Sequence, residues 1–329
     1  MNTTVDDFIV YPIEEYYVPC CISAVLAVIA VSLCIFIMIL VWRTKSRLHT
    51  VNHLLMCNTC CASIFVCVIL VNNYAFLLFG QWETRDLSCR WRGYLAYAGI
   101  TAVIYSYLIQ AISRFFFSVL SRKYRSLISF KTHYILIGMQ WVFVMLIASP
   151  SVITEDIRFY PKVLCWVPQQ YSLHIIYQIF AYYIIPVLII IFIYIYIYCR
   201  VSRETKNVGA STGRITNHKR SLEILRSILI LLAIYLGGAV PSILYQLTSL
   251  KIIYLINLAW LTLTVVVEKS CTLLVDREVR HVIKTLCYRS SRVMPFSNGQ
   301  LEPMGRSTLR SFKGIQKTAT IQSIRTIDE

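Results

Sequence analysis

The sequence predicts an all-α membrane protein, a bundle of seven transmembrane helices followed by an amphipathic eighth helix. Three observations support this fold class. Of the 329 residues, 57% are hydrophobic and only 15% are charged, whereas about a quarter of residues are charged in an average soluble protein. Seven stretches are apolar and long enough to cross a bilayer as helices. Basic residues are concentrated on one side of these stretches, as in multi-pass proteins.

Each predicted span is long enough to cross roughly 30 Å of hydrocarbon at about 1.5 Å per residue. The third is the clearest, because it carries no charge from Gly93 to Ser113. A helix from Cys89 to Arg114 would rise roughly 37 Å, so these two residues lie on opposite sides of the membrane. The seven spans are Val18–Trp42, Val51–Leu78, Gly93–Ser118, His133–Ile153, His174–Tyr198, Leu222–Thr248 and Ile252–Leu274.

The distribution of lysine and arginine predicts the orientation, since cytoplasmic loops carry the positive excess. Most of the 32 basic residues lie in the loops after spans one, three and five and in the region after span seven. We therefore expect a multi-pass protein of the plasma membrane with its N-terminus outside. The net charge of +16 then reflects topology rather than a face that binds nucleic acid. The outer side holds only Arg85, Arg90, Arg92, Arg158, Lys162 and Lys251, and Lys269 lies inside span seven.

The chain is expected to have four parts. After span seven, apolar residues recur at spacings of three and four, which predicts an amphipathic helix on the inner membrane surface. The segment beyond it is rich in Ser, Thr, Lys and Arg and poor in aromatic residues, as disordered tails are. The parts are an extracellular tail over residues 1–17, the transmembrane bundle over 18–275, the surface helix over 276–288 and a disordered cytoplasmic tail over 289–329.

Three kinds of modification are predicted outside the bundle. Asn2 begins a glycosylation sequon in the extracellular tail. Cys287, at the end of the surface helix, is a candidate for palmitoylation. Ser307, Thr308 and Ser311 lie beside basic residues of the cytoplasmic tail, where phosphorylation would reverse the local charge.

Most of the twelve cysteines lie in or near apolar spans and are expected to be small buried hydrophobes. Cys89 and Cys165 are the two most clearly exposed to the oxidising outer side. A disulfide between them would tie the loop before span five over the mouth of the bundle. The alternatives are two free thiols, or pairing with Cys20 or Cys21 near span one.

No motif for soluble catalysis is present. The sequence lacks HExxH, GxSxG, a phosphate-binding glycine loop and zinc-spaced cysteine pairs. Cys57 and Cys60 form a CxxC, but it lies within an apolar span. His133 and His174 lie near membrane interfaces and are expected to have hydrogen-bonded structural roles. We therefore expect a protein that is not an enzyme and that has no catalytic residue, cofactor or bound metal.

Several distinctive residues follow one another along the spans and can serve as anchors for comparison. Cys89 opens the third span and Arg114, within Ser113-Arg114-Phe115, closes it. The others are Phe79-Gly80-Gln81-Trp82 after span two, Trp141 with Pro150 in span four, Pro186 with Tyr194 in span five and Pro241 in span six. With these anchors, residues 18–288 resemble a class A, rhodopsin-like G-protein-coupled receptor.

Three motifs depart from the family pattern. Ser63 stands where the family has an aspartate that holds sodium, so a sodium site is not expected. In span six the family's Cys-Trp-x-Pro is replaced by Gly238-Ala239-Val240-Pro241, and in span seven its Asn-Pro-x-x-Tyr is replaced by Glu268-Lys269-Ser270-Cys271-Thr272. These alterations resemble those of the lineage-expanded orphan receptors found in some invertebrates.

The resemblance implies that an extracellular ligand moves helix six and that a heterotrimeric G protein then binds at the inner face, with arrestin and receptor kinases as further partners. The residues implied in activation are Arg114, Tyr194, Tyr235, Pro241 and Glu268. Because Ser113 replaces the acid that restrains Arg114 in the family, raised basal activity is expected; the alternative is that Arg114 only anchors to lipid phosphate. Tyr235 replaces a phenylalanine, so its hydroxyl needs a partner.

Glu268 and Lys269 have two interpretations. Adjacent residues on a helix do not face each other, so we expect them to have different environments. Glu268 could face inward toward Arg114 or a polar network. In the other interpretation both lie near the inner interface and Lys269 extends to lipid phosphate.

The resemblance excludes two ligand classes. Ala96 stands where amine receptors carry an aspartate, and Thr262 stands where opsins carry the retinal lysine. A peptide or a neutral small molecule is therefore expected rather than an amine. Bundle packing alone would also explain several tyrosines among the candidate pocket residues, which are Tyr97, Thr101, Gln178, Tyr182, Ser242, Tyr245 and Gln246.

Two other functions stay open on the sequence. A transporter or channel could use Glu268 and Lys269 in an ion path, although the chain shows no internal repeat and no paired broken helices. A seven-helix scaffold that does not signal could have kept the fold after its motifs changed.

Overall fold

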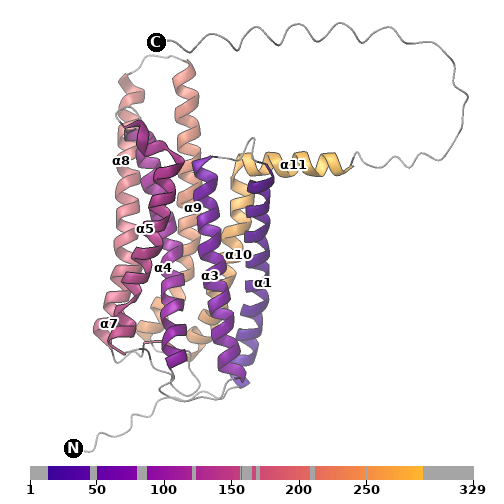
Figure 1. The fold of residues 1–329 in the computed structure, drawn as a ribbon, viewed down its shortest axis with the longest axis vertical. Coiled ribbons are helices and arrows are strands. Elements are labelled where there is room, and N and C mark those ends of the chain that lie inside the picture. The colour runs from indigo at the N-terminus through magenta and orange to yellow at the C-terminus, as the bar shows by residue number, and fades with distance from the viewer. Residues whose placement is uncertain are drawn as a thin grey trace, which may run out of the picture. The chain divides into compact units, whose positions relative to one another are not determined.

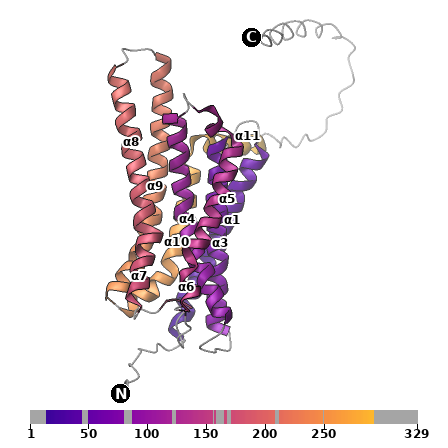
Figure 2. The same cartoon turned by 60° about the vertical axis from the view of Figure 1, so that its left-hand side comes forward.

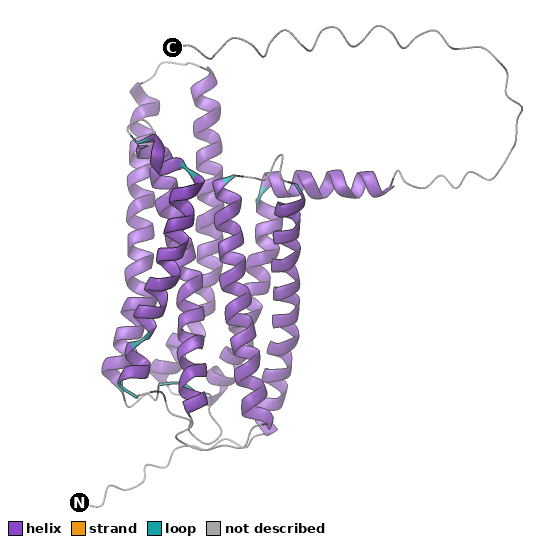
Figure 3. Ribbon diagram, in the orientation of Figure 1, coloured by secondary structure: helices purple, strands orange, loops and turns teal. Residues whose placement is uncertain are grey.

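The structure is a computed structural model that describes residues 14–44, 50–79, 87–120, 124–155, 157, 165–167, 171–207, 212–248 and 250–291. In these ranges the secondary structure is helical (Figure 3). Seven helices are long and apolar enough to cross a membrane. The predicted fold class, a seven-helix transmembrane bundle, is thus confirmed.

Contact between segments divides the chain into two compact units, Met1–Thr285 and Leu286–Glu329. The bundle belongs to the first unit; of the second, the structure describes the end of one helix. Figures 1 and 2 show the long helices of the first unit running alongside one another. They are α1 (Glu14–Arg43), α3 (Val51–Phe79), α4 (Leu87–Phe115), α5 (Phe130–Ala148), α8 (Ile185–Asn207), α9 (Thr212–Thr248) and α10 (Lys251–Val275).

Helix α4 is the central helix of the bundle. Every residue from Ala96 to Ala111 is buried, and this stretch is rich in Ala, Gly, Ser and Tyr rather than in leucine. Small residues let neighbouring membrane helices approach closely. A Cβ added at Gly99 would lie 3.1 Å from the Cα of Val66 on α3. The outer helices instead expose large aliphatic side chains, as expected for surfaces that face lipid.

Prolines mark the irregular points of two spans. Helix α5 ends at Ala148, and Pro150 begins the short helix α6 (Pro150–Ile153). The fifth span starts as α7 (Ser172–Gln178) and passes through a π-helical turn, η3 (Ile179–Ile184), before α8. In this turn the N–H of Ile185 donates to the carbonyl of Phe180. Pro186 follows directly and cannot donate a backbone hydrogen bond, which favours such a local rearrangement.

The last helix, α11 (Arg277–Ser291), begins directly after α10. Asp276 caps it, because its Oδ1 accepts from the backbone N–H groups of Glu278 and Val279 at 2.9 and 3.1 Å. Val279 and Val282 are buried against Leu40 of α1. These contacts account for the apolar spacing that predicts an amphipathic helix. Short helical turns elsewhere are η1 (Phe116–Leu120) and η2 (Arg125–Ile128).

Candidate functional site

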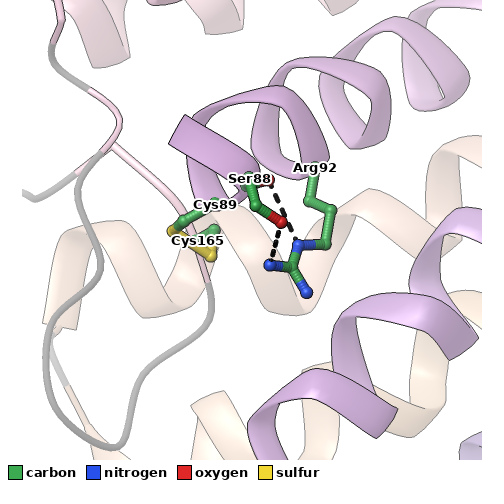
Figure 4. Close-up of a disulfide and its surroundings, with 4 residues drawn as sticks. All are labelled: Ser88, Cys89, Arg92 and Cys165. Atoms are coloured by element: carbon green, nitrogen blue, oxygen red, sulfur yellow. Dashed lines mark hydrogen bonds between the residues drawn. A yellow bond between two sulfur atoms is a disulfide. The ribbon is translucent and has the colours of Figure 1, made fainter. Parts of the chain in front are cut away.

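The N-terminal end of α4 is joined to the loop that follows α6. A disulfide links Cys89 and Cys165, whose Cα atoms lie 5.4 Å apart, and both residues are buried. Figure 4 shows this bond beside Arg92, which donates to the backbone carbonyl of Ser88 at 3.2 Å. Cys20 and Cys21 are free thiols. The loop is therefore fixed to α4 and not to α1.

Gly93 lets this loop lie directly against α4. A Cβ at Gly93 would be 2.5 Å from the carbonyl oxygen of Cys165 and 2.7 Å from the side chain of Ile157. Only a residue without a side chain allows such an approach. The disulfide and the glycine thus place residues 165–167 over the interior of the bundle.

An aromatic group lies beneath this loop. The backbone N–H of Val167 donates to the hydroxyl of Tyr97 at 3.0 Å. The ring of Trp166 meets that of Tyr97 edge to face at 4.9 Å, and Tyr182 lies 6.0 Å from Tyr97 on the other side. Thr101 donates to the carbonyl of Tyr97 one turn further in. The predicted pocket residues Tyr97, Thr101 and Tyr182 therefore lie together, with Gln178 on the same helical segment as Tyr182.

The predicted residues of α9 lie against α10. Ser242 donates to Oδ1 of Asn257 at 2.8 Å. The ring of Tyr245 lies 4.8 Å from that of Tyr254, and Tyr254 in turn contacts Tyr16 of α1 at 6.2 Å. The candidate pocket residues thus form two groups, one on α4 and the fifth span and one on α9.

Several buried polar atoms in the half of the bundle that holds the disulfide have no hydrogen-bond partner among the described residues. They are the hydroxyl of Tyr182, both side-chain polar atoms of Asn73 and Oε1 of Gln246. Such atoms are costly inside a membrane bundle unless water or a ligand satisfies them. Asn73 was not among the predicted residues, although Asn72-Asn73 is a conspicuous polar pair in span two.

Near the middle of the bundle, Glu268 and Lys269 form an ion pair. Nζ of Lys269 lies 2.6 Å from Oε1 of Glu268, with side-chain exposures of 2% and 1%. The hydroxyl of Tyr107 on α4 donates to the same oxygen. The expectation of separate environments was wrong, and so was the alternative that Lys269 extends to lipid phosphate. The long lysine side chain folds back to its neighbour because an isolated charge in the bundle would be far more costly.

Arg114, at the C-terminal end of α4, bonds to the neighbouring helix. Its guanidinium donates to Oδ1 of Asn52 on α3. Glu268, one of its candidate partners, instead pairs with Lys269. Tyr194, the other predicted residue at this level, has a buried hydroxyl with no hydrogen-bond partner among the described residues.

Ser113, which replaces the usual acid, bonds to His133. Its hydroxyl lies 2.9 Å from Nε2 of His133, and Nδ1 of the same ring lies 2.9 Å from the carbonyl of Ser129. A carbonyl can only accept, so Nδ1 carries the proton and Nε2 accepts from Ser113. His133 thus has a structural, hydrogen-bonded role.

Trp141, one of the sequence anchors, bonds to Asn58 of α3. Trp141 donates to Oδ1 of Asn58 at 3.1 Å, while Nδ2 of Asn58 donates to Gln140 at 2.7 Å. Gln140 also donates to the carbonyl of Ala102 at 3.1 Å, which joins α3, α4 and α5. The additional hydroxyl of Tyr235 donates to the carbonyl of Ile100 at 3.1 Å.

The family described as 7 transmembrane receptor (rhodopsin family) matches residues 34–296. The chain belongs to this family. No match was found among curated proteins. The protein is therefore a class A receptor of the G-protein-coupled type and a multi-pass membrane protein.

Some predicted sites of this receptor lie outside the described residues. These are Asn2, Ser307, Thr308 and Ser311, together with the side chain of Cys287. The structure also adds residues that sequence reasoning did not single out. Except for Asn73, their contacts join positions far apart in the chain, so no local pattern signals them; the residues are Asn52, Asn73, Tyr107, Trp166, Asn257 and Trp260.

Proposed function

We propose that this receptor lies in the plasma membrane with its N-terminus outside and binds an uncharged ligand, a small molecule or a peptide segment, in the outer half of the bundle. Ligand binding moves α9, and a heterotrimeric G protein then binds at the inner face. The proposed ligand class rests on the interior of the outer half of the bundle. This interior is neutral and aromatic, and it holds buried polar atoms that have no hydrogen-bond partner among the described residues.

Two ion pairs described at the rim support this ligand class, because their charges are already neutralised. Arg90 pairs with Glu155 at 2.9 Å, and Lys251 pairs with Glu15. Arg92 lies over the ring of Phe76 at 3.3 Å from its centroid. A salt bridge to a charged amine would need a carboxylate inside, and at the family's amine position stands Ala96, which is buried.

The position of Arg114 supports coupling at the inner face. It lies at the end of the central helix and is held by a neutral side-chain oxygen of Asn52. Ser113 stands where the family has the acid that restrains this arginine. We expect measurable basal activity for this reason, with arrestin and receptor kinases acting on the activated form.

The experiment is G-protein activation in cells that express the full chain, measured across a library of neutral peptides and small molecules. Wild-type receptor should give a basal signal above mock-transfected cells, and a ligand should raise it. Arg114→Ala should abolish both responses, while Arg43→Ala, an arginine at the inner end of α1, should preserve them. A signal absent in all cells would instead support a scaffold that does not signal, and a signal unchanged in Arg114→Ala would contradict coupling through Arg114.

The transporter alternative is not favoured. It depended on Glu268 and Lys269 lining an ion path, but these two side chains neutralise each other and are buried. A flux assay in which expressed receptor moved ions faster than Lys269→Met would reverse this conclusion.

A further inference from the structure

Pro241 leaves one backbone carbonyl of α9 without its usual donor. Proline has no N–H, so the carbonyl four residues earlier, that of Gly237, cannot be satisfied within the helix. Helix α9 nevertheless continues through Pro241 to Thr248. In the hydrocarbon region no water is available to satisfy such a group, so neighbouring helices must do so.

Trp260 of α10 supplies the missing donor. Its indole Nε1 lies 3.1 Å from the carbonyl oxygen of Gly237 and donates to it. The indole N–H has no acceptor capacity, so a carbonyl is a suitable partner. Trp260 is 40% exposed and lies within a helix long and apolar enough to cross a membrane. The contact therefore replaces the hydrogen bond that Pro241 removed.

The backbones of α9 and α10 are close enough for this contact because of Gly238. A Cβ at Gly238 would lie 2.8 Å from both Cγ2 and Oγ1 of Thr264. One further hydrogen bond, from Ser242 to Asn257, lies on the other side of Pro241. Asn257, Trp260 and Thr264 are spaced by three and four residues and so share one face of α10. The contacts of this face extend along α9 from Gly237 to Ser242.

We propose that Trp260 acts as a latch: its hydrogen bond to the Gly237 carbonyl restrains the hinge of α9, which is the turn from Gly237 to Pro241. A bend at Pro241 must move the Gly237 carbonyl relative to α10, because this is the turn at which the backbone ladder of α9 is broken. The indole hydrogen bond opposes that movement and holds α9 against α10. Trp260 is thus a positioning residue, since it acts on the hinge and needs to touch neither ligand nor G protein. The inference deepens the proposed function, in which movement of α9 carries the signal.

The test measures α9 itself, so that it does not depend on signalling. Full-length receptor in lipid nanodiscs carries spin labels, introduced through non-canonical amino acids, at the exposed positions Arg226 of α9 and Tyr134 of α5. Double electron–electron resonance then gives the distribution of distances between the labels. Trp260→Phe keeps an aromatic ring and removes the N–H donor. It should raise the ratio of open to closed populations about three- to tenfold, the range that an interhelical hydrogen bond supports.

The control is the same substitution in the Pro241→Ala background. Alanine restores the backbone N–H that can donate to Gly237, so the indole is no longer needed and Trp260→Phe should have little further effect. Leu263→Ala, another exposed residue of α10, should leave the distribution unchanged. The inference is overturned if Trp260→Phe has no effect, or if its effect is equal in both backgrounds. If the latch behaves as expected but no G protein is activated, the proposed function fails and the latch stands.

Discussion

The carboxylate of Glu268 and the ammonium of Lys269 stabilise the bundle only as a pair. Both are buried, and one oxygen of Glu268 accepts from Lys269 and from Tyr107. Removing one member of a buried ion pair leaves an uncompensated charge, which is more costly than removing both. Through Tyr107, Glu268 also joins the C-terminal part of α10 to α4.

Single substitutions here should therefore destabilise more than the double. Lys269→Met and Glu268→Gln should each lower the free energy of unfolding by about 3–5 kcal/mol, and the double variant by clearly less than either. Thermal unfolding in detergent, followed by a dye that reacts with exposed thiols, can measure this, since Cys34, Cys60 and Cys67 are buried and free. Lys284→Met is the matched control. Additive losses in the double variant would show that the two side chains do not depend on each other.

Asn52 should restrain Arg114 in this receptor. Asn52→Leu removes the acceptor on α3 and should raise basal G-protein activation several-fold. The upper limit of this effect is the strength of one charge-assisted hydrogen bond, about 1.5–3 kcal/mol. A basal second-messenger assay normalised to surface receptor measures it. A variant with the same basal activity as wild type would mean that Asn52 has no such role.

At the scale of elements, two adjacent glycines of α9 have different functions. Gly238 lies against Thr264 of α10, whereas a Cβ at Gly237 would meet nothing within 4 Å. From the sequence, Gly237, Gly238 and Pro241 together indicate a hinge in this helix. In the structure, Gly238 permits close packing of α9 against α10, whereas Gly237 has open space where a Cβ would lie.

Alanine at these two positions should change stability in opposite directions. Gly238→Ala should destabilise the receptor by about 1–3 kcal/mol through overpacking. Gly237→Ala should be neutral or stabilising by up to about 1 kcal/mol, because alanine favours the helix. Thermal unfolding of both variants gives the comparison, and Thr264→Ala should partly rescue Gly238→Ala. Equal stabilities of the two single variants would contradict the packing seen here.

At the scale of the whole molecule, one disulfide closes the outer side over residues far apart in the sequence. Cys89 and Cys165 are separated by 76 residues, and constraining a loop of that length restricts the unfolded chain. Replacing both by serine should lower the free energy of unfolding by about 2–5 kcal/mol. Cys21→Ser, which changes an exposed free thiol, is the control. The disulfide has no stabilising role if the double variant unfolds at the temperature of this control.

The sequence allows the fold to be predicted because membrane spans are long, apolar and bounded by charge. It also places Arg114 and Pro241, since proline and an arginine at a span end have local signatures. It does not predict the pairing of Glu268 with Lys269, because side-chain flexibility overrides the rule that adjacent helical residues diverge. Nor could it predict Trp260 donating to Gly237, since a contact between a side chain and a distant carbonyl depends on how two helices pack. Asn73 shows the same limit: its polarity is visible, but its burial is not.

The central claim, that this chain couples its bundle to a G protein through Arg114, is tested most directly with purified components. Full-length receptor in nanodiscs is mixed with heterotrimeric G protein, and the rate of nucleotide exchange is measured without ligand. Wild-type receptor should accelerate exchange above empty nanodiscs, and Arg114→Ala should reduce the rate to that of empty nanodiscs. Equal acceleration by wild type and Arg114→Ala, or no acceleration by wild type across a panel of G-protein subtypes, would contradict the claim.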